Sequence, residues 1–239
     1  MRNGWYAPAP SRDVAARMVD LVACTLSEFI ARESQPVGGL AKRAVDIVIA
    51  AVALVLLSPV LLAIAVLNRL TTGRSVVFSQ DRVGYRGGLF RCYKFRSMRH
   101  DAEEVLERHL AENPAAAREW AETQKLKHDP RVTPLGHLLR KSSLDELPQL
   151  WNVLRGEMSC IGPRPILESE LARYGEFAAD YMKTRPGITG LWQVSGRSRL
   201  SYGERVEIDR TYASYWSMRL DLWIVPQTIP ALLKFDETS

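Results

Sequence analysis

The stretch Ile47–Leu67, with the sequence IVIAAVALVLLSPVLLAIAVL, decides the fold because its 21 residues include no charged side chain. A straight helix of that length would be about 31 Å long, enough to cross the hydrocarbon core of a bilayer. Ser58 and Pro59 interrupt the stretch near its middle. Because a proline inside a helix removes a backbone hydrogen bond and clashes with the preceding turn, the sequence predicts a bend or break at this pair.

Basic side chains flank this apolar stretch at both ends: Lys42 and Arg43 precede it, and Arg69 and Arg74 follow it. Basic flanks favour the cytoplasmic side of a membrane. Two cytoplasmic ends require a chain that enters the bilayer and returns, so residues 40–70 are predicted to form a re-entrant membrane hairpin. A straight membrane span and a buried helix of a soluble core are the weaker alternatives.

The overall composition narrows the class of protein. At 239 residues the chain suits one large domain or one domain with appendages, and its net charge of +5 favours an anionic partner such as a phospholipid surface, a nucleotide or a nucleic acid. The three cysteines, Cys24, Cys92 and Cys160, are widely spaced and form no metal-ligand pattern, which fits a reducing compartment. No phosphate-binding glycine loop or dinucleotide fingerprint occurs, so kinases and dehydrogenases are poor candidates.

Residues 1–39 and 71–239 complete a three-part organisation. The first segment is predicted to be a leader with an amphipathic helix. In the second, Leu89–Phe95 alternates like a strand, and the Ala-, Glu- and Leu-rich run Asp101–Lys127 indicates a long helix or a helix pair broken at Asn113-Pro114. The predicted fold class is α+β: a mainly helical monotopic membrane protein with a re-entrant helix hairpin and a small β element.

Aromatic residues are concentrated towards the C-terminal end, at Tyr212, Tyr215, Trp216 and Trp223, with Ile224 beside them. They interleave with apolar residues, which suits helices that lie at the headgroup level of a membrane. Ordinary core packing accounts for the same residues equally well.

An acidic pair, Asp145-Glu146, is the strongest candidate site. A structural interpretation is available, because Ser143-x-x-Glu146 matches a capping box at the start of a helix. Pro148 weakens it, since with Ser143 as the N-cap the proline would fall inside the helix. Moving the cap to Asp145 puts Pro148 in the first turn and frees Glu146. The structural interpretation also predicts a buried helix face of Leu147, Leu150, Trp151 and Leu154, with Gly156 as the stop.

The acidic pair lies among basic residues that suit phosphate chemistry. They are Arg140 and Lys141 before it, Arg155 and Arg164 after it, and Lys94 and Arg96 upstream. Guanidinium groups bind phosphate oxygens through paired hydrogen bonds. Two adjacent carboxylates can divide the roles of metal ligand and nucleophile, and Mg²⁺ prefers one or two carboxylates together with substrate phosphates. By composition alone, a salt-bridge network explains the cluster as well as a site does.

Several motifs in a fixed order resemble one family, the bacterial sugar transferases that act as monotopic polyprenyl-phosphate phosphoglycosyl transferases. The resemblance covers about residues 40–235 and is carried by Lys42–Asp46, Ser58-Pro59, Gln80–Gly84, Tyr93–Met98, Asp129–Thr133, Leu139–Gln149, Asn152–Met158, Gly162–Pro165 and Pro186–Gln193. The leader and the insert that begins at Asn113-Pro114 are most similar to enzymes that initiate succinoglycan-type exopolysaccharides.

The resemblance implies a reaction and its central residues. A sugar 1-phosphate is transferred from a UDP-sugar, UDP-galactose or UDP-glucose, to polyprenyl (undecaprenyl) phosphate, with release of UMP. Asp145 would be the nucleophile that forms an aspartyl phosphosugar, and Glu146 the Mg²⁺ ligand beside it. A covalent intermediate suits two mutually repelling phosphate substrates, because they can use one pocket in turn.

The resemblance assigns further residues. Arg140 and Arg164 fall where the family places phosphate-binding arginines, and Ser58-Pro59 matches its helix-breaking pair. Lys94 and Arg96 are additional phosphate-binding candidates that could instead hold the sheet. For Arg197 and Asp209, site and structural roles are equally open.

The implied partners are the UDP-sugar, polyprenyl phosphate and an anionic phospholipid membrane, and a homodimer is allowed. No nucleic-acid partner is expected, because no recognition motif accompanies the basic charge. The implied location is the cytoplasmic face of the bacterial inner membrane. A non-catalytic membrane adaptor for polysaccharide machinery is the alternative function.

Overall fold

The structure is a computed structural model, and it describes residues 35–72, 75–123, 126–196 and 200–233. The predicted amphipathic leader helix lies outside the described residues, as do Arg74 and Arg197.

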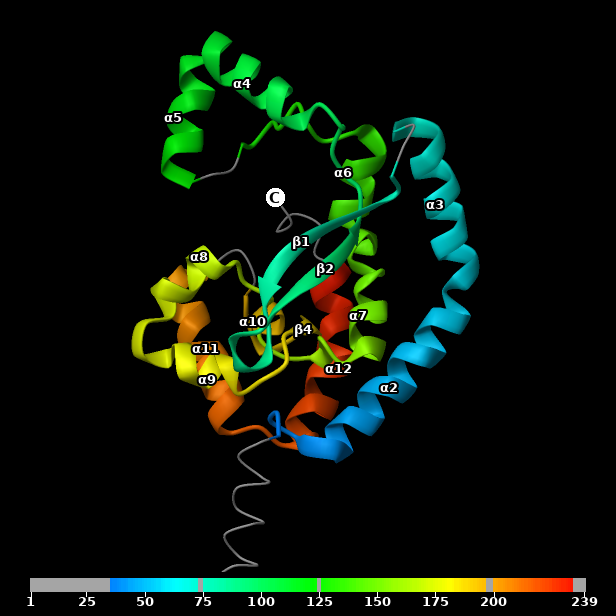
Figure 1. Ribbon diagram of the computed structural model, residues 1–239, viewed down its shortest axis with the longest axis vertical. Helices are drawn as coiled ribbons and strands as arrows, with labels where there is room; N and C mark the ends of the chain where they lie inside the picture. Colours follow the sequence, from blue (N-terminus) through cyan, green and yellow to red (C-terminus); the bar gives the residue numbers. More distant parts are fainter. Residues whose placement is uncertain (1–34, 73–74, 124–125, 197–199, 234–239) are drawn as a thin grey trace, which may run out of the picture.

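Two helices, α2 (Gly39–Leu56) and α3 (Ser58–Thr72), form a bent pair along one side of the molecule (Figure 1). Their axes differ by 62°, and the break falls at the predicted Ser58-Pro59 position. The Ser58 hydroxyl donates to the Val55 carbonyl at 2.8 Å, which pairs a carbonyl that the proline leaves without its helical donor. No single helix among the described residues has the length and apolar character of a membrane span, although the bent pair has them jointly.

The bent pair is inverted relative to a helix of a water-soluble protein. Its buried residues include Lys42 and Asp46 on α2 and Asn68 on α3. Its exposed large apolar residues are Leu40, Val45, Ile47, Val48, Ile49, Val52, Val55, Leu56, Val60, Leu62, Val66, Leu67 and Leu70. Lys42, Asp46 and Asn68 therefore face the protein, and most of the large apolar side chains of the pair face outward.

The β structure is small, which confirms the predicted α+β class. Strand β1 (Val77–Val83) pairs antiparallel with β2 (Leu89–Phe95) around the short helix η1 (Tyr85–Gly87). Strand β3 (Ser159–Ile161) pairs in parallel with β4 (Gly187–Thr189).

The helices make up most of the body. They are α4 (Ala102–Glu112), α5 (Pro114–Thr123), α6 (Pro134–Lys141), η2 (Leu144–Glu146), α7 (Gln149–Arg155), α8 (Glu168–Leu171), η3 (Ala172–Phe177), α9 (Ala178–Met182), α10 (Leu191–Ser195), α11 (Tyr202–Ser214) and α12 (Met218–Leu233). The predicted helix pair broken at Asn113 is confirmed as α4 and α5, which stand apart from the rest in Figure 1. The Asn113 side chain accepts from the backbone N–H groups of Ala115 and Ala116, and so caps α5.

The central core joins the bent pair α2–α3 to the rest of the protein. It contains Ala50 of α2, Phe90 of β2, Val153 of α7 and Ile224 of α12, all buried. Helix α7 lies alongside α2 (Figure 1), and the Arg43 guanidinium donates to two carbonyls near the α7 C-terminus. The acidic pair, which lies two residues before α7, is thereby connected to the bent pair through α7.

The aromatic residues near the C-terminus divide between the two predicted roles. Tyr212 and Ile224 are fully buried in the core, and Trp216 packs against it. Tyr215 and Trp223 are 78% and 52% exposed. Core packing therefore explains one part of the set, and an outward-facing surface the other.

Candidate active site

Helix α6 sets the direction in which the chain reaches the acidic pair. The Thr133 hydroxyl caps α6 by accepting from the Gly136 N–H at 2.9 Å, and Pro134 occupies the first helical turn. At Gly136 a Cβ atom would lie 2.0 Å from the Ser97 carbonyl oxygen, so the helix packs backbone to backbone against the segment that follows β2. This close approach brings the end of α6 and the acidic pair beside β2.

Both predicted starts of the following helix are wrong. Ser143 has φ 56° and its side chain makes no capping hydrogen bond in the described structure, while Pro148, and not Asp145, is the N-cap of α7. Asp145 and Glu146 lie instead in the separate short helix η2. The left-handed turn at Ser143 redirects the chain after α6, so the acidic pair is not a conventional helix start.

The predicted buried face of α7 is also wrong in one position. Trp151 is 54% exposed, and the buried α7 residues are Gln149, Leu150, Asn152 and Val153. Leu150 is the predicted residue that the core fully buries, and Leu147 and Leu154 pack against the core half-buried. The predicted stop is confirmed, because Gly156 caps α7 with φ 83°.

Asp145 is nearly buried, with 8% of its surface exposed. Burial raises the pKa of its carboxyl to about 6, the nearby charge of Lys94 opposes that rise, and the adjacent Glu146 adds to it. The carboxylate is therefore ionised at neutral pH but poorly solvated. A desolvated anion surrounded by cations is suited to nucleophilic attack on an electron-poor centre.

Glu146 is the more accessible carboxylate of the pair. Its side chain is 31% exposed and accepts from the Lys94 ammonium group at 2.6 Å. Lys94 comes from β2, so this ion pair joins the strand to η2. Of the basic candidates, Lys94 is thus brought directly to the acidic pair.

Arg140, in the last turn of α6, lies close enough to Asp145 for their charges to interact. Its Nε donates to the Ser97 hydroxyl at 2.8 Å. Burial lowers the pKa of the Arg140 guanidinium, and the charges of Asp145 and Asp129 oppose that fall. Asp129 is itself paired with Arg131 at 2.6 Å, so Arg140 keeps guanidinium donors for another acceptor.

A pocket of about 340 Å³, open to solvent, lies beside the acidic pair and is named the dyad pocket. Its lining includes Arg82, Cys92, Lys94, Glu146, Gln149, Arg164, Pro165, Trp192 and Gln193. Three cations, Arg82, Lys94 and Arg164, therefore line one open volume together with the Glu146 carboxylate. Such a pocket has the charge needed to hold a phosphate group.

Arg82 is a pocket residue that sequence reasoning did not single out, although its run Gln80–Gly84 carried part of the resemblance. The guanidinium donates to the Pro165 carbonyl at 3.3 Å and to the Gln80 side chain at 2.8 Å. Burial, followed by the charge of Arg164, lowers the pKa of Arg82. Arg82 stands out because it is buried beside a second arginine, Arg164. This position is visible only in the folded structure.

Two other predicted candidates are engaged elsewhere. Arg96 donates to the Ser75 carbonyl at 3.0 Å and to the Ser75 hydroxyl at 2.8 Å, so it holds the entry to β1. Asp209 is 2% exposed and accepts from the Tyr174 hydroxyl at 2.8 Å. Burial raises the pKa of Asp209 to about 7. Neither side chain lines the dyad pocket.

The acidic pair fits a magnesium ion only in combination with a substrate. Among residues 35–72, 75–123, 126–196 and 200–233, no three or more His, Cys, Asp and Glu side chains converge to hold a metal. Mg²⁺ is commonly held by one or two carboxylates plus substrate phosphates and water. Glu146 lines an open pocket with three cations that attract phosphate, so it matches that donor set.

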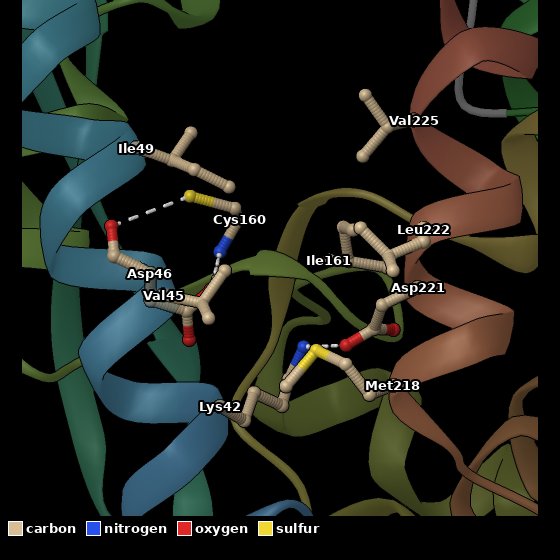
Figure 2. A pocket seen from close by; sticks show the side chains of 10 residues that line it. All are labelled: Lys42, Val45, Asp46, Ile49, Cys160, Ile161, Met218, Asp221, Leu222 and Val225. Atoms are coloured by element: carbon tan, nitrogen blue, oxygen red, sulfur yellow. Dashed lines mark hydrogen bonds and ion pairs between the residues drawn. The ribbon is translucent and has the colours of Figure 1, made fainter.

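A second pocket, of about 300 Å³, lies between α2 and α12 and is mainly apolar (Figure 2). The Lys42 ammonium group and the Asp221 carboxylate point toward each other across its base, 2.6 Å apart. Asp46 accepts from the Cys160 N–H at 2.9 Å and from the Ser159 hydroxyl at 3.0 Å. Every one of these buried polar groups has a protein partner. We therefore interpret this pocket as a packing contact that connects α2 to β3 and α12.

Comparison with known proteins identifies the family. A family model described as bacterial sugar transferase matches residues 37–235. The chain is 50% identical over 207 residues to the exopolysaccharide production protein ExoY of Rhizobium meliloti (strain 1021), a match that covers 85% of this chain and 92% of that relative.

Two longer relatives carry more specific names. The undecaprenyl-phosphate galactose phosphotransferase of Salmonella typhimurium is 46% identical over 196 residues, which cover 82% of this chain and 41% of that relative. The UDP-glucose:undecaprenyl-phosphate glucose-1-phosphate transferase of Escherichia coli (strain K12) is 41% identical over 201 residues, covering 81% of this chain and 40% of that relative. With the family model spanning most of its length, this chain belongs to the bacterial sugar transferase family.

Proposed function

We propose that this protein transfers a hexose 1-phosphate from a UDP-sugar to polyprenyl (undecaprenyl) phosphate, with release of UMP, and so initiates assembly of an exopolysaccharide repeat unit. The observation that carries the proposal is the acidic pair itself: buried Asp145 lies near the charges of Lys94 and Arg140, and Glu146 lines the dyad pocket together with Lys94 and Arg164. The names of the two longer relatives, one a galactose and one a glucose transferase, support UDP-galactose or UDP-glucose as the donor.

The chemistry proceeds in two displacements at one phosphorus atom. A carboxylate oxygen of Asp145 attacks the sugar-bearing phosphorus of the UDP-sugar, and the bond to the bridging oxygen breaks, so that UMP leaves with the electron pair. The product is a mixed anhydride, an aspartyl phosphosugar. An oxygen of polyprenyl phosphate then attacks the same phosphorus, the bond to the Asp145 oxygen breaks, and the carboxylate is regenerated.

The surrounding residues supply charge and position. Lys94, Arg140 and Arg164 stabilise the negative charge on the transferring group, as preorganised cations do in phosphoryl transfer. Glu146 would hold Mg²⁺, which when bound neutralises phosphate charge as a Lewis acid. Burial of Asp145 at 8% exposure keeps water from competing with the lipid acceptor for the intermediate.

We also propose that α2 and α3 insert into the cytoplasmic leaflet of the bacterial inner membrane as a re-entrant hairpin. The support is their inverted pattern, in which Lys42, Asp46 and Asn68 are buried and the apolar side chains point outward. Outward apolar surface of this extent is stable in lipid and not in water. Because α7 packs on α2, the dyad would be held close to the height of the lipid phosphate.

One assay tests the reaction. Purified full-length protein is incubated with undecaprenyl phosphate, Mg²⁺ and a panel of UDP-sugars, and UMP and lipid-linked product are both followed. UDP-galactose or UDP-glucose should give both products in equal amounts. Asp101→Asn is the matched control, since Asp101 is an exposed carboxylate paired with Arg99. UMP release without lipid-linked product, or neither product with any sugar, would contradict the proposal.

Accessibility tests the hairpin separately. In a Cys24→Ser background, Leu40→Cys and Leu70→Cys place thiols at the two ends of the pair, where the native side chains are 75% and 76% exposed. A membrane-impermeant thiol reagent added to intact cells should label neither position, and both should react after the cells are opened. External labelling of one end only would show a straight span.

A further inference from the structure

The dyad pocket gathers buried polar atoms that the protein leaves without partners. In the described part of the chain, four buried side-chain atoms lack a hydrogen-bond partner: Gln149 Nε2, Trp192 Nε1, Gln193 Oε1 and Arg205 Nε. Three belong to residues that line this pocket, and the Arg205 guanidinium lies 5.7 Å from the centroid of the Trp192 ring. Native proteins keep few such atoms, because each is costly. Their concentration at one place indicates that a ligand completes them.

The unpartnered atoms come from two separate segments that the fold brings to one pocket. Gln149 opens α7 directly after the dyad, and Trp192 and Gln193 come from the first turn of α10. Gln149 and Trp192 are only 1% and 8% exposed, so bulk water reaches them poorly. This depth distinguishes them from polar groups at a pocket rim.

The orientation of two of these side chains is set by the protein. Gln193 Nε2 donates to the Ile188 carbonyl at 3.1 Å, which leaves Oε1 for a ligand. The Arg164 and Arg205 guanidinium groups lie 5.4 Å and 5.7 Å from the Trp192 ring centroid. Because two guanidinium groups already lie over the Trp192 ring, the group that remains for a ligand is the indole N–H.

The unpartnered set in the residues that line the pocket is thus two neutral N–H donor groups, those of Gln149 and Trp192, and one carbonyl acceptor, that of Gln193. A phosphate offers acceptors alone and would leave Gln193 Oε1 unpaired. The imide edge of uracil is complementary in number and kind, because O2 and O4 accept and N3–H donates. Cytosine differs on that edge, with an amino donor at position 4 and an acceptor at N3.

We propose that Gln149, Trp192 and Gln193 form a subsite that recognises the uracil base, next to the cations that take the phosphates. This inference deepens the proposed function, since that function supplies the UDP-sugar. It assigns the choice of nucleotide to side chains outside the acidic pair. Arg205 is then a positioning residue, which acts by holding the Trp192 ring.

The test compares UDP with CDP, which share ribose and phosphates and differ only in the base edge. Binding of each to the full-length protein is measured by calorimetry, without sugar or lipid acceptor, so no turnover is needed. Variants are Gln149→Met, Trp192→Phe and Gln193→Met, and Gln227→Met on the exposed part of α12 is the matched control. Melting temperature and circular dichroism check that each variant is folded.

The wild type should bind UDP at least about tenfold more tightly than CDP. Each pocket variant should lose about fivefold to a hundredfold in UDP affinity and reduce the UDP-to-CDP ratio towards one, while Gln227→Met changes neither. Equal wild-type affinity for the two nucleotides, or a ratio that survives in folded variants, would overturn the subsite.

Measuring the binding of UDP-hexose as well distinguishes a uracil subsite from a sugar subsite. If the variants bind UDP normally and lose affinity only for UDP-hexose, the three side chains face sugar hydroxyls and the uracil assignment is overturned. Failure of the proposed function looks different, because UDP selectivity would then persist in a protein that forms no lipid-linked sugar.

Discussion

The helix pair α2–α3 and the dyad pocket treat buried polar groups in opposite ways. In the pair, Lys42 meets Asp221 at 2.6 Å, Asp46 accepts from Ser159 and Cys160, and Asn68 donates to the Arg96 carbonyl at 2.7 Å. In the pocket, Gln149, Trp192 and Gln193 keep buried atoms without partners in the described structure.

This difference separates structural polarity from functional polarity. A buried polar group that stabilises a fold needs its partner within the protein, since leaving it unpaired costs stability. A buried polar group kept for a ligand lacks its partner until the ligand arrives. Changes in the two regions should therefore affect different quantities, stability in the first and binding or catalysis in the second.

The largest expected effect is on catalysis in Asp145→Asn. The amide cannot serve as the nucleophile, so transfer should fall by at least about 10⁴-fold while the protein stays folded. UMP release and lipid-linked product are measured together, with Asp101→Asn as the control. Turnover within tenfold of the wild type would place the nucleophile elsewhere.

The next effect is on stability in Lys42→Met. This change leaves the Asp221 carboxylate buried and unpaired with a cation, which should lower the free energy of unfolding by about 3–5 kcal/mol. Denaturant titration in detergent measures it, and the activity of the remaining folded protein should be close to normal. The double variant Lys42→Met/Asp221→Leu tests the reason, because removing both charges should recover part of the loss. A single variant as stable as the wild type would show that the pair contributes nothing.

A smaller effect links the acidic pair to pH. Because the folded pKa of Asp145 is raised to about 6 from 3.8, its protonated form is favoured in the fold. The resulting stability is fully present below pH 4 and is lost as pH rises through 6.

Asp145→Asn should therefore raise the free energy of unfolding at pH 8 by on the order of 2 kcal/mol, and should change it little at pH 4. Thermal unfolding in the presence of a metal chelator measures both values. The transfer rate of the wild type should likewise decline below about pH 6, as the nucleophile becomes protonated. An equal stability change at both pH values would mean that the pKa of Asp145 is not raised.

The smallest effect is expected for Gln149→Met. Since Gln149 Nε2 has no partner in the described structure, replacing the amide should not lower the free energy of unfolding of the ligand-free protein, and should raise it by about 1 kcal/mol because an unsatisfied buried N–H group is removed. Urea titration without nucleotide measures it. A loss comparable to that of Lys42→Met would place Gln149 with the structural polar groups and erase the contrast between the two regions.

The sequence predicted the elements whose signals are local. The apolar stretch broken at Ser58-Pro59, the strand Leu89–Phe95 and the helix pair around Asn113 all have signals within a few residues, and the structure has them at those positions. Strand β1, in contrast, is defined mainly by its antiparallel pairing with β2.

Features that depend on distant contacts were missed. The start of α7 was placed too early because a left-handed residue, Ser143, and the separate short helix η2 lie between α6 and α7, and no local pattern in the sequence records them. Arg82 lines the dyad pocket with Arg164, and no pattern in the sequence indicates that the two arginines lie together. Arg96, next to Lys94 in the same motif, is bound instead to Ser75. Residues of one motif can thus serve different purposes, and only their three-dimensional surroundings separate them.

The central claim, that the buried carboxylate of Asp145 carries the sugar phosphate, can be tested by the mass of the intact protein. The full-length enzyme is mixed with UDP-galactose or UDP-glucose and Mg²⁺ in the absence of polyprenyl phosphate, quenched in acid and analysed by mass spectrometry. The account predicts a gain of one hexose phosphate, located on Asp145 by peptide mapping, and its disappearance when undecaprenyl phosphate is added. An unmodified wild-type protein that still releases UMP and forms lipid-linked sugar, or the same adduct on Asp145→Asn, would contradict it.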